Sequence, residues 1–292
     1  MKKDRNLRSV NTDGGVNLQF KLLSAIGIII IVSGHCYHGG MELAYNWFPP
    51  YSYNLALFVF ISGYFYKTDY EENVGKYIWK RTKRLLIPAY LWNIFYGGMV
   101  AFLGLFGFTI GAKPDLYNLF VMPFVDGEAF QYNLGSWFVY PLFLVCIINV
   151  LFRKFLKLIH LDNEFIVLIV YLAIGMIGIN TAIGNPTAIN GIVKLLVRTM
   201  FFLPCYEFGR FYKAVLEKKD TLNNVAYFAI IFAVQLILLT FCKDLEYTPS
   251  SFTKFNNGFI IPYISSITAI AFWLRVSRLL VPAIGNSKLV RL

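Results

Sequence analysis

Long apolar runs without charge are the feature that most restricts how this chain can fold. The clearest run covers residues 22–32, which hold no charged residue and no proline and lie between Lys21 and His35. A run of this kind is typical of the core of a membrane-spanning helix. Hydrophobic residues make up 57% of the chain and charged residues only 15%, far from the usage of a soluble domain. We therefore expect an all-α fold, a polytopic transmembrane helical bundle.

Further apolar runs repeat along the chain and predict about eight spans. They are expected at residues 17–38, 54–66, 85–110, 136–152, 165–179, 192–208, 225–242 and 259–274. An additional apolar piece, LFVMPF at residues 119–124, is too short to cross a bilayer and is expected to be a loop or re-entrant segment. An even number of spans places both ends of the chain on the same side.

The basic residues indicate which side that is. Of the 27 Lys and Arg residues, 22 fall in the tail or in the loops on the side of the tail. By the positive-inside rule this side is cytoplasmic, so the chain is expected in the cell membrane with its N-terminus in the cytoplasm. The net charge of +11 is thus explained by topology, and no nucleic-acid partner is expected. The predicted divisions are a flexible cytoplasmic tail (1–16), a transmembrane domain (17–276) and a cytoplasmic connector (277–292).

The four cysteines predict neither a disulfide framework nor a metal site. They lie in or beside apolar runs without CxxC spacing: Cys36, Cys146, Cys205 and Cys242. No permanently bound cofactor is expected. The basic N-terminus precedes an apolar stretch that is too long for a signal-peptide core and lacks an A-x-A site, so we expect an uncleaved anchor.

His35 is the first candidate functional residue. It lies fourteen positions after Lys21, or roughly 21 Å along a helix in a hydrocarbon layer about 30 Å thick. His35 is therefore expected inside the membrane, nearer the exit side, where an ionisable side chain needs a polar partner or a wet cavity. A functional histidine and a neutral imidazole held by a neighbouring helix both remain open. His38 is expected at the water boundary.

The densest group of basic residues lies in KYIWKRTKR, residues 76–84. On a helix this segment places Lys76, Lys80, Lys83 and Arg84 on one face, with Arg81 to one side. Such a face at the cytoplasmic boundary can hold the phosphates of a ligand. Attraction to anionic lipid headgroups, worth about 1 kcal/mol per basic residue, is the alternative.

Two charged residues interrupt the predicted sixth span. Arg198 and Glu207 are nine residues apart, about 13 Å along a helix, so they cannot pair with each other. Each needs a partner on another helix or on a ligand. Arg198 is a candidate to stabilise negative charge in the outer half of the bundle, and snorkelling or an interhelical hydrogen bond is the alternative.

Four segments, in this order, resemble the acyltransferase 3 family of integral-membrane O-acyltransferases. They are the first helix with its Gly-His end, NLQFKLLSAIGIIIIVSGH; the second helix, LFVFISGYFYK; the basic entry to the third, KRTKRLLIPAYLW; and the tryptophan-bearing fourth, GSWFVYPLFL. Many members have an arginine eleven residues before the histidine, where this chain has Ser24, and its basic residue, Lys21, lies one turn earlier. The family pattern has ten helices, so the end at VPAIGNSKLVRL leads us to expect that the C-terminal helices are lacking and that the activity of this form is in question.

The resemblance implies a reaction and a role for each candidate residue. An acyl group, expected to be acetyl, would move from cytoplasmic acyl-CoA to a hydroxyl of a cell-envelope saccharide, with His35 as general base. The basic residues listed above would hold the CoA phosphates. Candidates for lining the cavity or stabilising charge are Ser62, Trp137, Tyr140, His38, Glu207 and Arg198. The expected partners are acyl-CoA, the saccharide and membrane lipid, and self-association stays open. The alternative function is a carrier or flippase for such a saccharide, without covalent chemistry.

Overall fold

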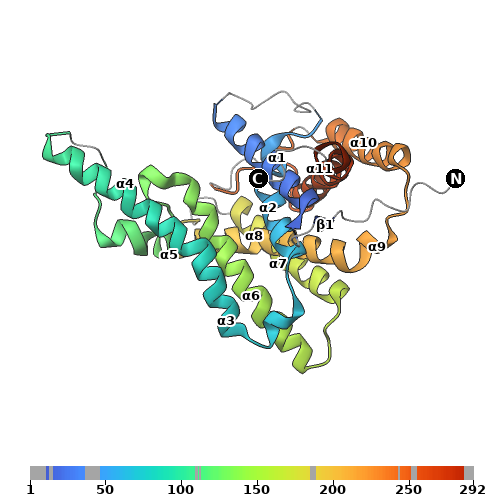
Figure 1. Cartoon of the computed structure of the whole chain (residues 1–292), viewed down its shortest axis with the longest axis horizontal. Coiled ribbons are helices and arrows are strands. Elements are labelled where there is room, and N and C mark those ends of the chain that lie inside the picture. The colour runs from blue at the N-terminus through green and yellow to red at the C-terminus, as the bar shows by residue number, and fades with distance from the viewer. Residues whose placement is uncertain are drawn as a thin grey trace. The chain divides into compact units, whose positions relative to one another are not determined.

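The structure is a computed structural model of the whole chain, and it describes residues 11–12, 16–36, 47–108, 111, 113–184, 189–242, 244–250 and 255–285. Helices dominate the described residues, which confirms the all-α prediction (Figure 1). In chain order the elements are β1 (Asn11–Thr12), β2 (Val16–Asn17), α1 (Leu18–Cys36), η1 (Pro50–Ser52), α2 (Asn54–Tyr64), η2 (Thr68–Glu71), α3 (Val74–Arg81), η3 (Thr82–Leu86), α4 (Ile87–Leu105), η4 (Tyr117–Val121), α5 (Met122–Val125), η5 (Gln131–Phe138), α6 (Val139–Leu158), α7 (Glu164–Gly184), α8 (Gly191–Phe211), η7 (Tyr212–Leu216), α9 (Glu217–Lys219), α10 (Asn224–Phe241) and α11 (Ile261–Gly285).

The chain divides into two compact units. The first unit comprises residues 1–62, 215–247 and 254–292, and the second comprises residues 63–214 and 248–253. The candidate functional residues therefore fall into two groups. His35 and Ser62 belong to the first unit, and the basic segment, Arg198 and Glu207 belong to the second.

In the first unit, α11 packs against both α1 and α10 (Figure 1). A side-chain amide joins two of these helices, because Gln19 donates from Nε2 to the carbonyl of Leu274 at 3.0 Å. Gly27 allows α1 to approach α2 closely, since a Cβ at this position would lie 2.9 Å from side-chain atoms of both Leu57 and Phe58. The first half of α1 is thus part of a packed group of helices.

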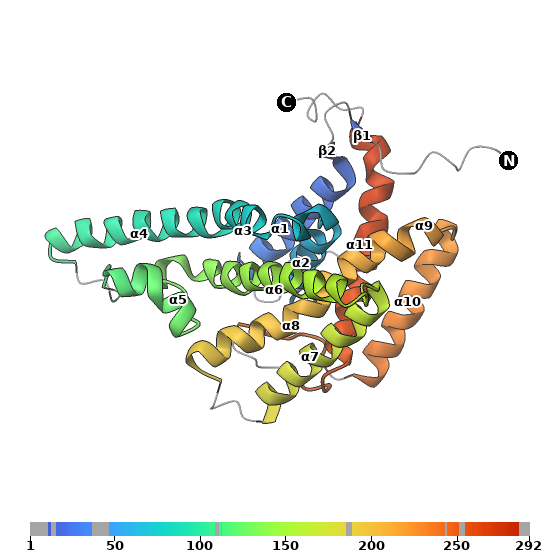
Figure 2. The same cartoon turned by 90° about the horizontal axis from the view of Figure 1, so that it is seen from below.

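In the second unit, α8 packs against α6 and α7. Two glycines allow other helices to approach α8 closely. A Cβ at Gly178 on α7 would lie 2.9 Å from the Cβ of Met200, and a Cβ at Gly63 on α2 would lie 1.8 Å from the carbonyl oxygen of Tyr206. Helices α3 and α4 are continuous through η3 (Figure 2). Helix α3 and η3 pack against α6, whereas α4 packs against η4 and η5.

A proline explains the π-helical turn η3 in this long helix. Pro88 has no N–H to donate to the carbonyl four residues before it. The N–H of the preceding residue, Ile87, donates to the carbonyl of Thr82, five residues before Ile87, which is the hydrogen bond of a π-helix. The same arrangement recurs at η4, where Met122 donates to Tyr117 just before Pro123. These turns shift the angular register of the residues that follow them.

Within the described part of the chain, six helices are long and apolar enough to cross a membrane. They are Leu18–Cys36, Val74–Leu105, Gln131–Leu158, Glu164–Gly184, Asn224–Phe241 and Ile261–Ala283. The multi-pass character is thus confirmed, whereas the count of eight spans and the cytoplasmic placement of both ends stay predictions. Helix α2 has only 11 residues, about 16 Å, and α8 carries several charges along its length.

Two helices extend beyond the spans that the sequence predicted. The predicted third span began at residue 85, but the helix starts at Val74, so the whole basic segment is helical. The predicted eighth span ended at residue 274, whereas α11 continues to Gly285 and includes much of the predicted connector. Arginine is a good helix former, so the helix continues through Arg275, which pairs with Asp220. Most of the predicted tail, residues 1–16, lies outside the described residues.

Candidate functional site

His35 lies in the last turn of α1, and its side chain is exposed on the surface of the first unit. Helix α1 has 19 residues, about 28 Å, so the imidazole is near the end opposite Lys21, as the sequence predicted. The preceding residue, Gly34, accepts a hydrogen bond at its carbonyl from the hydroxyl of Tyr51 at 2.9 Å. Ser62 donates to the carbonyl of Phe58 in its own helix, at 2.9 Å. His38 lies outside the described residues.

The basic segment is one helix but presents two kinds of cation. Lys76, Lys83 and Arg84 are exposed, and Lys83 lies over the ring of Trp79, itself 55% exposed. In contrast, Lys80 and Arg81 are half-buried. The predicted single face is therefore divided: Lys80 belongs with Arg81 on the inner side.

Tyrosine hydroxyls hold the two inner cations. Lys80 donates from Nζ to the hydroxyl of Tyr70 at 3.1 Å, and Arg81 donates from Nε to that of Tyr77 at 3.0 Å. The hydroxyls of Tyr77 and Tyr206 are 3.4 Å apart, which connects Arg81 to α8. No carboxylate pairs with Lys80 or Arg81 among the residues that the structure describes. Two half-buried cations without an anion make this side of α3 suited to a phosphate ligand.

Arg198 is buried in the second unit and is surrounded by carbonyl groups. Its guanidinium donates to the carbonyls of Gly127, Pro249 and Ser250, and it lies over the ring of Trp137 with its central carbon 4.6 Å from the ring centroid. The structure thus brings together two predicted residues, Arg198 and Trp137. Its partners are carbonyls of chain segments far away in the sequence and outside the helices, whereas the sequence predicted a partner on another helix or on a ligand.

Tyr140 is the third predicted residue of this region and is only 1% exposed. Its ring packs in an apolar cluster with Leu86, Phe143 and Leu195. Its hydroxyl has no hydrogen-bond partner among the described residues. Whether Ser62, Trp137 or Tyr140 lines a substrate cavity stays a prediction.

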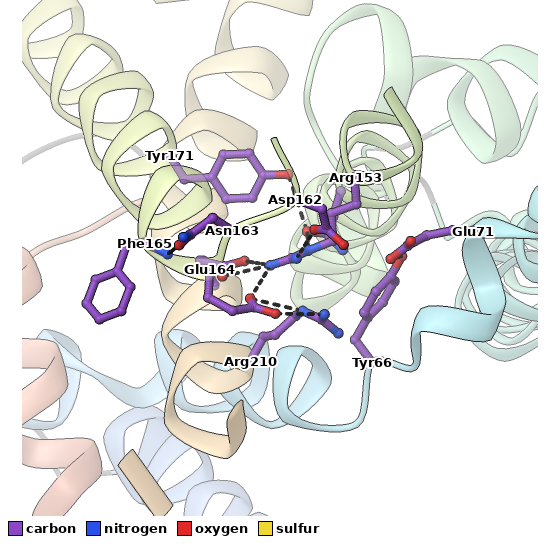
Figure 3. Close-up of polar contacts among 11 residues, drawn as sticks. Tyr66, Glu71, Arg153, Asp162, Asn163, Glu164, Phe165, Tyr171 and Arg210 are labelled. Carbon is purple, nitrogen blue, oxygen red and sulfur yellow. Dashed lines mark hydrogen bonds and ion pairs between the residues drawn. The ribbon is translucent and has the colours of Figure 1, made fainter. Parts of the chain in front are cut away.

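Glu207 is completely buried, and both of its carboxylate oxygens bind Arg153 on α6, at 2.7 and 2.8 Å. Arg153 also contacts Glu164 at 2.8 Å and Asp162 at 3.5 Å. Arg210 binds the other side of Glu164 at 2.8 Å (Figure 3). These residues form an ion network that joins the ends of α6, α7 and α8. The predicted place of Glu207 in a substrate cavity is not tested by this contact.

A further carboxylate lies beside this network. Glu71 is buried at the end of η2, where Tyr66 donates to its Oε1 at 3.2 Å, while its Oε2 has no hydrogen-bond partner among the described residues. Burial raises the pKa of Glu71 above its ordinary value, and the negative charge of Asp162 raises it further. Arg153 and Arg210 both lie over the ring of Tyr66 and act in the opposite direction.

Sequence reasoning missed Arg153, Glu164 and Arg210 as members of a cluster. It counted Arg153 and Arg210 only as part of the cytoplasmic excess of positive charge. The one signal that pointed to them was the need of Glu207 for a partner on another helix. Their identity depends on how α6, α7 and α8 pack, which spacing within one helix does not reveal.

The comparisons with known proteins agree with the motifs. The family model described as an acyltransferase domain, acyltransferase 3, matches residues 17–292. No curated protein and no solved structure matches the chain. The match includes the Gly-His end of α1, the basic segment and the tryptophan-bearing α6 region. The chain therefore belongs to the acyltransferase 3 family, and it is a multi-pass membrane acyltransferase.

Proposed function

We propose that the protein is an O-acyltransferase that moves an acetyl group from cytoplasmic acetyl-CoA to a hydroxyl of a cell-envelope saccharide. The observation that carries this proposal is the pair of inner cations on α3. Lys80 and Arg81 are held by Tyr70 and Tyr77 and pair with no carboxylate in the described part of the chain. A family member with such a pair has the donor groups that the phosphates of CoA need.

In the proposed reaction, His35 acts as general base. The acceptor oxygen attacks the thioester carbonyl carbon while the imidazole takes the hydroxyl proton. The C–S bond of the resulting tetrahedral intermediate then breaks, and the CoA thiolate leaves with the proton returned by the imidazolium. Positioned acid–base catalysis of this kind contributes about 10² to 10⁴ in rate. The imidazole that we propose for this task lies in the last turn of α1.

For Arg198 we propose a positioning role. Its donors are engaged by the carbonyls of Gly127, Pro249 and Ser250, and its face by Trp137. In this arrangement it holds two chain segments against the ring of Trp137. These three bonds use one N–H each from Nε, Nη1 and Nη2 of the guanidinium.

Incubation of the purified full chain with radiolabelled acetyl-CoA and candidate envelope saccharides tests the function. We expect labelled saccharide from the wild-type protein and none from His35→Ala, with unchanged membrane insertion. His38→Ala should have a mild effect, because His38 is expected at the water boundary. Saccharide labelling by His35→Ala at the wild-type rate would exclude the catalytic role of His35.

Binding of acetyl-CoA separates this function from the alternative. A carrier or flippase for a saccharide needs no CoA site. Failure of the wild-type protein to bind acetyl-CoA, together with transport of saccharide across proteoliposomes, would replace the acyltransferase proposal by the carrier.

A further inference from the structure

The carbonyl next to His35 is held by a side chain from a different element. The hydroxyl of Tyr51, in η1, donates to the carbonyl of Gly34 at 2.9 Å. Gly34 directly precedes His35, and α1 ends at Cys36. The last four carbonyls of a helix have no partner within the helix, and in a membrane protein they need another donor. Tyr51 supplies that donor for the turn that carries the imidazole.

The absence of a side chain at Gly34 is what allows this contact. A Cβ at this position would lie 3.2 Å from the hydroxyl oxygen of Tyr51 and 3.4 Å from the ring carbon that bears it. The shorter distance requires the tyrosine to move by a few tenths of an ångström. The glycine of the Gly-His pair is therefore explained by the tyrosine that packs over it.

Tyr51 itself is on a firmly held segment. The neighbouring Ser52 donates to the carbonyl of Pro49 at 2.7 Å and accepts, at its own carbonyl, from Ser266 on α11. Tyr53, on the other side, accepts a hydrogen bond from the indole N–H of Trp273 at 2.6 Å. Both flanking residues are thus fixed to α11, and the Tyr51 hydroxyl is preorganised toward α1.

We propose that Tyr51 is a positioning residue for His35: its hydroxyl fixes the last turn of α1 and so directs the imidazole. This inference rests on the proposed role of His35 as general base. Tyr51 touches no reacting atom. Its effect is on the chemical step, because a misplacement of about 1 Å can cost roughly 100-fold in rate.

The test is Tyr51→Phe, which keeps the ring and removes the hydroxyl. We expect kcat to fall roughly ten- to a hundred-fold, while KM for acetyl-CoA and the melting temperature in detergent stay close to wild type. The matched control is Tyr227→Phe, which also removes a hydroxyl bonded to a helix carbonyl in the same unit, that of Ala271 at 3.0 Å. The control should keep the wild-type kcat.

Gly34→Ala gives a second, independent reading. Alone, it should lower kcat, because its methyl group displaces the Tyr51 hydroxyl. Added to Tyr51→Phe it should cost much less, since the bond it would break is already absent and the two changes are then non-additive. Additive losses in the double variant would overturn the inference, as would a Tyr51→Phe enzyme that behaves like Tyr227→Phe.

Failure of the inference can be distinguished from failure of the proposed function. If His35→Ala is inactive and Tyr51→Phe is fully active, the role of His35 as general base is supported and only the positioning role of Tyr51 is excluded. An active His35→Ala would remove the proposed role of His35, and the role of Tyr51 with it.

Discussion

At the scale of single residues, Glu71 is a carboxylate whose negative charge the surrounding structure opposes. It is buried, one of its oxygens has no hydrogen-bond partner among the described residues, and its pKa is raised by burial and by Asp162. A carboxyl whose pKa is raised on folding contributes stability that is complete below its unfolded pKa, about 4.3, and is lost as the pH rises through the folded value. At neutral and alkaline pH the wild-type protein should therefore be less stable than a variant with an uncharged residue at position 71.

Glu71→Gln tests this directly. The amide oxygen still accepts from Tyr66, and no charge is buried. We expect the melting temperature of Glu71→Gln to exceed that of wild type at pH 8 and the difference to shrink toward pH 5. Glu164→Gln is the contrast, because it breaks ion pairs with Arg153 and Arg210 and should lower the melting temperature. A difference that does not vary with pH would show that Glu71 has no raised pKa.

Among the elements, α3 separates ligand binding from lipid binding. Its inner cations, Lys80 and Arg81, are held by tyrosines, whereas the outer ones are exposed beside Trp79. Charge-assisted hydrogen bonds contribute about 1.5 to 3 kcal/mol each, against roughly 1 kcal/mol for attraction to a headgroup. The two groups should therefore respond differently to neutralisation.

We expect Lys80→Gln with Arg81→Gln to weaken acetyl-CoA binding by about 100-fold or more, which corresponds to two such contacts. The same change at Lys83 and Arg84 should cost less. Lys154→Gln with Lys157→Gln is the control, because both lysines are exposed at the end of α6 predicted to be cytoplasmic. Isothermal calorimetry in nanodiscs of neutral lipid gives the dissociation constants. Equal losses in all three variants would favour lipid attraction as the function of the basic segment.

For the whole molecule, the open question is whether the charged helix α8 crosses the membrane. The positive-inside rule predicts that it does, with residue 190 outside and residue 218 inside. In a background of Cys36→Ser and Cys242→Ser, the remaining native cysteines are buried. A membrane-impermeant maleimide applied to intact cells should then label Asn190→Cys, and label Lys218→Cys only after permeabilisation. Labelling of both positions on the same side would reduce the number of spans.

The sequence by itself determined the class of the molecule and the location of its helices. Uncharged apolar runs form helices in any packing, because backbone N–H and C=O groups must be satisfied within the segment when lipid surrounds it. For this reason α1, α6 and α10 lie close to the predicted positions. The separation of Arg198 and Glu207 along one helix also excluded their pairing without any knowledge of the fold.

Only the tertiary structure decided which groups meet. Arg153 was found as the partner of Glu207, three backbone carbonyls as the partners of Arg198, and Tyr51 as the partner of Gly34. The division of the basic segment depends likewise on the tyrosines that pack against it. These contacts join residues distant in the sequence, and their free energy depends on distance and burial after packing. The spacing of residues within one helix shows which side chains share a face, but it does not show which helix or loop packs against that face.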